Sequence, residues 1–516
     1  MKNINKIYLY AIAMVIVATT SCKKQLEINP AISVSIERAL STRENLNAAI
    51  IGVYARLKGL RLYGRDMFAV GEALSENGLA TNKSGRLINE AANVPGAHFG
   101  TWQSAYFAIA EINIILNAIP SLNVTPAVTI AERNGWEGEL LFLRALLYHD
   151  LVRIYGYEPG FGVAGQDRGG VPIVTQTPLT IEAALANTPG RASVDSVYSR
   201  IYADLNSAIT RLSNPASFAP GKVTLAAAQA LFARVALYNR DYNLANTMAT
   251  SVLTAFQPRI PTAGNYVGSW TSAVHPESIF EVRYANQAEN LGVNESLQTT
   301  YTTLRDRGNP NVVQGFGDLV AQTSLLTQLG FTGVVNAGGT FTSRSDDARN
   351  LLFERGSTAR GTARIECTKF IGKNGFPNLD NVPVIRVSEV LLTRAEARAN
   401  ATNANGTANL SFSLANATAD LVALKTLRYA AYATTQAPTD ATLTTAPLLL
   451  NEIYRQRRIE LAFEGHRWFD FKRLGPTSPI NPQTSTKIIY TDFRMLPPIP
   501  QREIDNNPAI IQNFNY

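Results

Sequence analysis

The chain has 516 residues, of which 46% are hydrophobic and 17% charged, and its formal net charge is +7 at pH 7. This length and apolar content allow a large buried core. The lysines and arginines are scattered, with no run of five and no stripe interleaved with aromatics. Because phosphate contacts need clustered cations, we exclude a nucleic-acid partner.

The first residues have the pattern of a bacterial export signal. Two lysines precede an apolar run from Ile7 to Ala18, which is too short to span a bilayer, and small residues and then Cys22 follow. We predict a lipoprotein signal peptide over residues 1–21 and a lipidated tether over residues 22–40 that begins at Cys22. The alternative is an ordinary secretory signal with a cysteine nearby.

The use of cysteine agrees with lipidation. The chain has two cysteines, Cys22 and Cys367. If Cys22 carries lipid, no internal disulfide forms, although exported proteins use disulfides freely. A bridge between the two would have to fasten a flexible tail, which is the less economical alternative. We therefore expect Cys367 to be a small, buried apolar residue.

The first half of the chain reads as a set of helices. Apolar residues at helical spacing predict helices over residues 41–60, 101–118, 131–155, 194–212, 222–238 and 242–256. The last two have the character of a tetratricopeptide unit, because small residues such as Ala227, Ala230 and Ala233 allow close helix contact. Residues 61–98 and 156–190 lack this period and are predicted to be irregular. We assign residues 41–260 to a helical-repeat scaffold.

The second half of the chain begins with a region of different composition. Residues 261–384 are rich in Gly, Asn, Thr and Ser, and only residues 277–284 alternate like a strand. A stretch this long without helices is usually functional or disordered, so we expect it to face a ligand. Helices return at 385–401 and 415–430, and the prolines of the last segment predict an extended tail without helix. Residues 385–516 form the C-terminal part of a single domain that spans 41–516.

A charged stripe marks the C-terminal part. If residues 450–464 form a helix that continues, Arg457, Glu460, Glu464 and Arg467 lie along one face in the order plus, minus, minus, plus. Apolar residues separate them, and charges in such surroundings are costly to bury unless each is paired. We predict a structural ion network at a helix junction, where Gly465 ends one helix and His466 begins the next.

Several segments together carry a family resemblance. They are LLFLRALLYHDLVRIYG (140–156), VTLAAAQALFARVALY (223–238), VIRVSEVLLTRAEA (384–397), RRIELAFEGHRWFDFKRLG (457–475) and IPQREIDNNPAIIQN (499–513). In this order, and after a start that looks like a lipobox, the chain resembles the SusD/RagB family of nutrient-binding lipoproteins from Bacteroidetes. The resemblance implies an all-α fold of tetratricopeptide-like helical repeats, with long irregular insertions and a few short strands.

The resemblance also implies a function. Proteins of this family lie on the outer face of the outer membrane, capture oligosaccharides or polysaccharides, and pass them to a SusC-like TonB-dependent transporter. In RagB-like members the captured nutrient is a peptide. Neither catalysis nor a cofactor is implied. Two other functions stay open from the residues: a surface glycoside hydrolase, and a helical-repeat assembly subunit that contacts only protein.

Motifs for catalysis or metal binding are not convincing. GFGVAG at 160–165 matches G-x-G-x-x-G, but a dinucleotide site needs a strand before it and a helix after it. The four histidines are far apart, and no nucleophile elbow is present. Asp346 and Asp347 are adjacent on a loop beside Arg349, which favours a salt bridge over a hydrolytic pair. We predict no catalytic residue and no metal site.

Glycan binding calls for flat aromatic faces and for side chains that bond hydroxyl groups. Trp102 and Trp136 lie in phase on helices, and Trp468 lies in the charged segment, so we expect all three in the core. The irregular regions offer the remaining candidates for ligand contact. They are Asn77, Asn82, Asn93, Phe99, Tyr266, Trp270, Tyr284, Asn286, Asn290, Tyr301 and Arg305.

Overall fold

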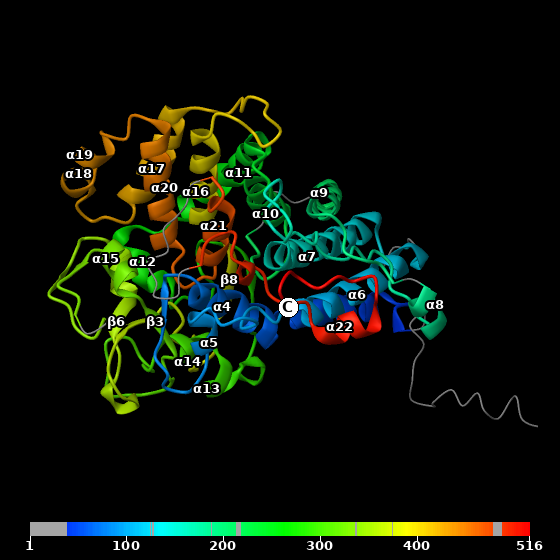
Figure 1. Cartoon of the computed structure of the whole chain (residues 1–516), viewed down its shortest axis with the longest axis horizontal. Coiled ribbons are helices and arrows are strands. Elements are labelled where there is room, and N and C mark those ends of the chain that lie inside the picture. Colours follow the sequence, from blue (N-terminus) through cyan, green and yellow to red (C-terminus); the bar gives the residue numbers. More distant parts are fainter. Residues whose placement is uncertain are drawn as a thin grey trace, which may run out of the picture.

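The computed structural model describes residues 39–123, 125, 128–186, 188–212, 218–335, 338–373, 375–477 and 488–516. The predicted signal peptide, Cys22 and nearly all of the tether lie outside the described residues. Helices dominate the described part, and a few short strands accompany them (Figure 1). None of the helices in these ranges is both long and apolar enough to cross a membrane.

The helices of the first half are α3 (Arg43–Leu57), α4 (Asp66–Leu74), α5 (Ile88–Ala91), α6 (Trp102–Ala118), α7 (Ile130–Tyr155), α8 (Ile181–Ala186), α9 (Val194–Arg211), α10 (Leu225–Tyr238) and α11 (Tyr242–Phe256). Each of the six helices predicted in this half is present. Short polar side chains cap five of these six helices, all except α6, because an oxygen before the first turn accepts from a backbone N–H that has no helical partner. Thr42, Thr129 and Asp241 do so for α3, α7 and α11.

These helices pack on one another in chain order. α7 contacts α6 and α9, α10 contacts α9 and α11, and α11 contacts α16 (Val387–Ala399). In Figure 1 they form a row from α6 and α7 to α16 and α17 (Leu414–Thr426). Ala227, Ala230 and Ala233 of α10 are buried, which allows the close approach that the small residues predicted. The row has the layered character of a helical repeat.

The second half is tied together by four described sheets of two antiparallel strands each. The pairs are β1 (Gly78–Ala80) with β3 (Leu319–Ala321), β2 (Ser278–Val282) with β8 (Val382–Arg386), β4 (Phe331–Thr332) with β5 (Ser343–Arg344), and β6 (Phe353–Arg355) with β7 (Ile365–Cys367). Two of these sheets join segments that are far apart in the sequence. The pairing of β1 with β3 brings the first irregular region against the second.

The remaining helices are mostly short. They are α12 (Ala263–Ser269), α13 (Gly292–Glu295), α14 (Leu297–Tyr301), α15 (Thr323–Gln328), α18 (Tyr432–Thr435), α19 (Ala437–Asp440), α20 (Ala446–Glu460), α21 (Arg467–Leu474) and α22 (Gln501–Asn506). The predicted helices over 385–401 and 415–430 correspond to α16 and α17.

Four local predictions were wrong. Residues 156–190 and 261–384 were expected to lack helices, but the first stretch contains α8 and the second contains α12 to α15. Residues 61–98 are not irregular throughout, because they contain α4, all nine residues of which are buried. A helix that is buried all round has no polar face, so its hydrophobic period is lost. The tail is not free of helix either, since residues 501–506 form α22. Pro500 directly precedes that helix, where proline is compatible with a helix start because no helical N–H bond is lost.

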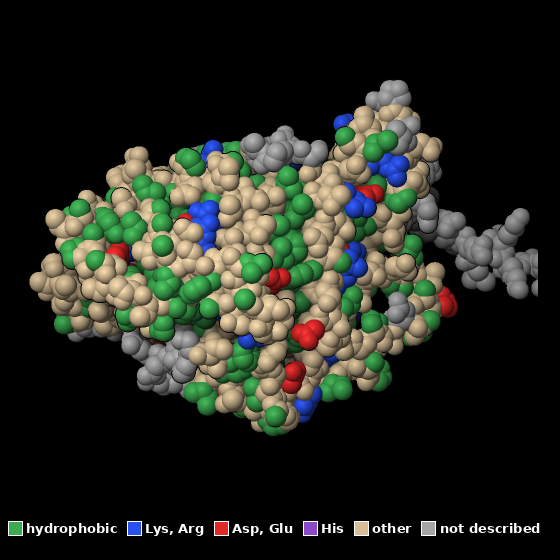
Figure 2. All heavy atoms as spheres, turned by 90° about the horizontal axis from the view of Figure 1, so that it is seen from above, with side chains coloured by type: hydrophobic (Ala, Val, Ile, Leu, Met, Phe, Trp, Pro, Cys, Tyr) green, Lys and Arg blue, Asp and Glu red, His purple; other side chains and the backbone are tan. Residues whose placement is uncertain are grey.

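One continuous hydrophobic core runs through the helices and the short sheets. Cys367 is fully buried in it and forms no disulfide within the described part of the chain. Burial raises the pKa of its thiol to about 12, which keeps it protonated and unreactive, as expected of a packing residue. On the face in Figure 2, charged side chains are few and hydrophobic side chains are scattered.

Candidate functional site

The predicted ion network is buried, but its geometry differs from the prediction. Arg457, Glu460, Glu464 and Arg467 are all at most 6% exposed. They do not share one helix face, because α20 ends at Glu460 and a turn leads to α21. Phe463 and Gly465 in this turn have positive φ values of 64° and 76°. The start of the second helix at His466 is as expected, but the first helix ends at Glu460 and not at Gly465, and the continuous charged stripe was wrong.

Each charge of this segment pairs with a residue from elsewhere in the chain. The carboxylate of Glu460 lies 2.9 to 3.4 Å from the guanidinium nitrogens of Arg349, Arg386 and Arg428. Burial alone raises the pKa of a carboxyl group, but Arg428 and the other arginines outweigh it and hold the pKa of Glu460 well below its usual value. This pairing keeps Glu460 ionised in the core.

The other three charges are paired in the same way. Glu464 bonds Arg386 at 2.7 Å and Lys369 at 2.6 Å. Arg457 bonds Asp470 at 2.8 Å, and the Nε of Arg467 donates to Glu76 at 2.8 Å. Asp347, considered above as a hydrolytic carboxylate, bonds Arg349 at 2.7 Å instead.

Two aromatics that were predicted to face a ligand belong to this network. The guanidinium of Arg428 lies 4.4 Å from the centre of the Tyr266 ring, and the Lys369 ammonium lies 4.8 Å from that of Trp270. Both rings are at most 1% exposed. Because both rings are buried, neither face is open to a sugar.

Six of the eleven predicted contact residues are buried in this way. They are Asn77, Asn93, Phe99, Tyr266, Trp270 and Tyr301. Their partners are internal: Asn77 bonds Glu72 and Arg458, Phe99 stacks on Phe469, and Tyr301 packs against Phe463. Because no surface is left for a ligand, we correct the prediction for these six. Trp102, Trp136 and Trp468 are buried as expected.

Three of the remaining residues gather near the end of α3. The Tyr284 hydroxyl donates to the Lys58 carbonyl at 3.2 Å, and the Lys58 ammonium lies over the Tyr284 ring at 5.7 Å. Asn286 and Asn290 use their side-chain oxygens to accept from nearby backbone N–H groups. These contacts shape the 284–290 segment locally.

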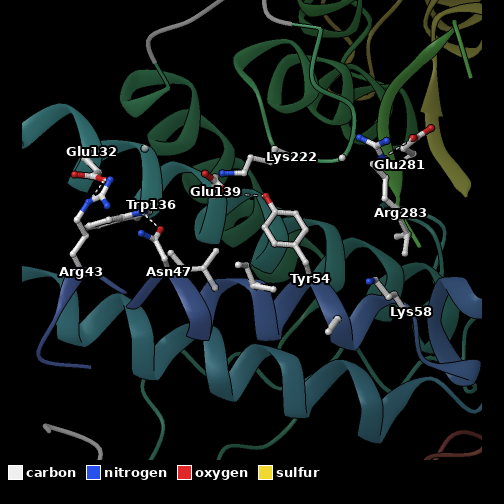
Figure 3. Close-up of a pocket in the computed structure, with 16 residues that line it drawn as sticks. Arg43, Asn47, Tyr54, Lys58, Glu132, Trp136, Glu139, Lys222, Glu281 and Arg283 are labelled. Carbon is white, nitrogen blue, oxygen red and sulfur yellow. Dashed lines mark hydrogen bonds and ion pairs between the residues drawn. The ribbon is translucent and has the colours of Figure 1, made fainter. Parts of the chain in front are cut away.

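Lys58 also lines a groove of about 590 Å³ between α3, α7, β2 and the turn at Lys222 (Figure 3). Its polar side chains largely satisfy one another. Arg43 bonds Glu132 at 2.6 Å, the indole N–H of Trp136 donates to Asn47, and the Tyr54 hydroxyl donates to Glu139. Because Trp136 is only 5% exposed, it offers no ring face. These pairs fasten α3 to the scaffold and leave little bonding capacity for a ligand.

A different surface has the features that a sugar needs. We call it the loop surface and define it by Asn82, Lys83, Arg86, Arg305, Phe316, Asp318 and Arg360. The pairing of β1 with β3 builds it, together with bonds from Thr81 to the carbonyl oxygens of Gly317 and Asp318 at 2.7 and 2.8 Å. It contains the two remaining predicted residues: Asn82 is exposed on it, and the half-exposed Arg305 lies on the hairpin that precedes Phe316.

An aromatic ring flanked by arginines lies at the centre of the loop surface. Phe316 is half-buried, and the guanidinium groups of Arg86 and Arg360 lie 4.9 and 4.4 Å from its ring centre. Its backbone N–H donates to the Thr299 carbonyl at 3.0 Å. This bond fixes the backbone from which the ring projects.

The glycines on both sides of Phe316 are required by space. A Cβ at Gly315 would lie 2.2 Å from the Thr302 carbonyl oxygen. Gly317 has φ +62°, and a Cβ there would lie 2.9 Å from the Glu366 carboxylate. Backbone can approach this closely only where no side chain intervenes. The two glycines of the Gly-Phe-Gly sequence therefore allow the close backbone packing on both sides of Phe316.

Buried carboxylates support the cations of the loop surface. Asp318 is 1% exposed, accepts from Ser84, and lies 3.4 Å from the Nε of Arg86. Burial raises the pKa of Asp318 above its ordinary value. Lys83 lies 3.2 Å from Glu366, which also accepts from Thr302 and Thr303. Guanidinium and ammonium donors beside an aromatic ring can bond hydroxyl groups while the ring contacts the apolar face of a sugar.

Sequence reasoning missed three central residues of this surface, Arg86, Phe316 and Arg360. Phe316 had a local signal, since it stands between two glycines in a region already expected to face a ligand. The two arginines had none, because they reach the ring from segments that are distant in the sequence.

Comparison with known proteins agrees with the fold. A model of the SusD family matches residues 367–516, and a second, described as "Starch-binding associating with outer membrane", matches residues 24–237. SusD-like protein P38 of Formosa agariphila is 24% identical, and the match covers 100% of this chain and 99% of that protein.

Solved structures give the same result. A SusD superfamily protein of Bacteroides thetaiotaomicron matches with a TM-score of 0.73 and 25% identity, over 91% of this chain and 99% of that one. A laminarin-binding SusD-like protein matches with a TM-score of 0.64 and 21% identity, over 92% and 100%. Both ends of the chain thus match models of SusD-type proteins, and its fold is that of the SusD superfamily.

Proposed function

We propose that this protein captures carbohydrate at the bacterial outer membrane and that the loop surface is its binding site. The observation that carries the proposal is the Phe316 ring, held at the surface between two required glycines with Arg86 and Arg360 beside it. The family description "Starch-binding associating with outer membrane" and the laminarin-binding structural neighbour support the ligand class.

Binding at such a surface needs no chemical step. The apolar face of a sugar ring lies against Phe316, and the guanidinium groups of Arg86 and Arg360 donate to its hydroxyl oxygens. Capture raises the local concentration of the glycan where a transporter can take it up. We propose a SusC-like TonB-dependent barrel as the transporter, as the family resemblance implies.

A glycan-binding experiment tests the site. We expect Phe316→Ala to weaken binding of the best glycan in a panel that includes starch and laminarin oligosaccharides by about 10- to 100-fold, or roughly 1.4–2.8 kcal/mol, because a central aromatic anchor is lost. Isothermal titration calorimetry measures the change. Phe107→Ala is the matched control, since Phe107 is 55% exposed on α6, outside the loop surface.

The result can contradict the proposal in two ways. Unchanged glycan affinity in Phe316→Ala would place the site elsewhere. If the wild-type protein binds no glycan but binds peptides from a mixed pool, the captured nutrient is a peptide.

We also propose that the protein is anchored by lipid on Cys22, which lies outside the described residues, and that it faces the extracellular side. The motivation is the lipobox-like start of the chain. We expect Cys22→Ala to move the protein from the membrane fraction to the soluble fraction, because a soluble domain without an acyl chain has no membrane affinity of this kind. Immunoblots of the separated fractions measure this, with Cys367→Ala as the control that stays in the membrane. Retention of Cys22→Ala would exclude this anchor.

A further inference from the structure

A second pocket lies on the helical-repeat scaffold. It has a volume of about 570 Å³ and is formed by α9, the turn between α10 and α11, and the loops at 159–160 and 403–407. We call it the repeat pocket. It shares no residue with the loop surface, and in Figure 1 the labels α9, α10 and α11 lie well apart from β3 and β6. A ligand in the repeat pocket would therefore be bound separately from one on the loop surface.

One wall of the repeat pocket is a single face of α9. Tyr198, Ser199 and Tyr202 follow Asp195 by three, four and seven residues, which places all four on the same side of the helix. The opposite wall is the α10–α11 turn, which supplies Asn239, Arg240, Asp241 and Asn243. Two tyrosine rings thus lie in a lining whose other polar side chains are amides, carboxylates, the hydroxyl groups of Ser199 and Thr407, and one guanidinium.

The turn is held in place by bonds to both neighbouring loops. Arg240 has φ 54°, and its Nη2 donates to the Pro159 carbonyl at 2.8 Å. Its own carbonyl accepts from the Ala404 N–H at 3.1 Å. The Asn403 side-chain oxygen accepts from the Tyr242 N–H at 2.9 Å. The pocket is therefore formed before any ligand arrives, which lowers the entropy lost on binding.

Bonding capacity remains free in the repeat pocket. One oxygen of Asp241 caps α11 by accepting from Leu244, while the other accepts no hydrogen bond from the described residues. The carboxylate of Asp195 and the side-chain oxygen of Asn239 likewise accept no hydrogen bond from the described residues. The side-chain N–H of Asn239 donates to the Tyr202 hydroxyl at 3.1 Å. The Tyr198 hydroxyl is also without a partner among the described residues, although Tyr198 is only 3% exposed.

This combination selects the ligand class. Sugar hydroxyls both donate and accept, and carboxylates beside amides match both capacities, while the Tyr202 ring can cover an apolar sugar face. Asp195 and Asp241 outnumber Arg240, which disfavours an anionic ligand. The described residues contain no group of three or more His, Cys, Asp or Glu that would hold a metal ion.

We propose that the repeat pocket is a second saccharide site, which binds an uncharged mono- or disaccharide unit. This second site rests on the proposed function and extends it, because it adds a binding site on the scaffold. It can be tested independently of the loop surface.

The test uses the soluble protein without its first 22 residues and a panel of neutral disaccharides, with maltose, laminaribiose and cellobiose as probes. We expect one disaccharide to bind Phe316→Ala with a stoichiometry of one, and Tyr202→Ala in that background to weaken this binding at least tenfold. Asp195→Ala, which leaves the Ser193 cap of α9 intact, gives a second variant with the same expected loss. Glu182→Ala on the exposed helix α8 is the control.

The outcomes separate the two sites. Binding that Tyr202→Ala abolishes and Phe316→Ala leaves unchanged supports the repeat pocket, even if the loop surface is wrong. If the panel binds the wild type but not Phe316→Ala, the repeat pocket is overturned and the loop surface stands. Calcium binding that Asp195→Ala removes, without any saccharide binding to Phe316→Ala, would also overturn the proposal in favour of a cation site.

Discussion

Replacement of Glu460 by alanine is expected to lower the free energy of unfolding by about 3–5 kcal/mol, because it leaves buried cations without their partner. Glu460 is fully buried and bonds three arginines. Arg428 and Arg386 keep Glu277 as a second partner, and Arg349 keeps Asp347, so the network weakens without falling apart entirely. The loss is nevertheless large, since desolvated guanidinium groups cannot recover their hydration in the core.

Chemical denaturation measures this change, with Glu182→Ala on the exposed helix α8 as the control. Glu464→Ala is expected to have a smaller effect. It leaves Lys369 without its carboxylate partner and removes only one of the three carboxylates around Arg386. We expect a loss of about 2–4 kcal/mol there. An unfolding midpoint of Glu460→Ala equal to that of the control would mean that water reaches these charges.

Gly465→Ala is expected to destabilise the fold by roughly 3 kcal/mol or more, through backbone strain and overpacking together. Gly465 has φ +76°, and a Cβ would lie 2.2 Å from the Met67 carbonyl oxygen and 2.8 Å from the Phe68 Cα. Both of these atoms belong to the backbone of α4, so no side chain can move aside. The Gly465 N–H also donates to the buried Glu72 at 2.9 Å, and a shift of the turn would strain that bond.

Gly308→Ala separates the two causes. Gly308 has φ +75° but nothing within 4 Å of the position of its Cβ, so alanine there carries the conformational cost alone. Denaturation of both variants gives the steric part as the difference. Equal losses in the two would show that α4 and the turn at Gly465 are able to separate.

The helices were predictable because their cause is local. Apolar residues at helical spacing and short polar caps predicted α3, α6, α7, α9, α10 and α11, with bounds that differ from the observed ones by at most about three residues. The α4 helix was missed because its pattern does not separate a buried face from an exposed one. Its charged residues Asp66 and Glu72 are buried together with its apolar residues. The sequence also predicted that the charges of the C-terminal segment are paired. An unpaired charge buried among Ile459, Ala462 and Phe463 would cost too much free energy.

The sequence by itself determined the helical scaffold, the family resemblance and the burial of the charged segment, because each rests on patterns within short segments of the chain. Only the tertiary structure decided which cations pair with Glu460, since Arg428, Arg386 and Arg349 lie 32, 74 and 111 residues away. It also decided which aromatics stay at the surface. Trp270 and Phe316 both stand in glycine-containing segments that were predicted to be irregular, yet long-range packing buries the first and leaves the second half-buried beside two arginines.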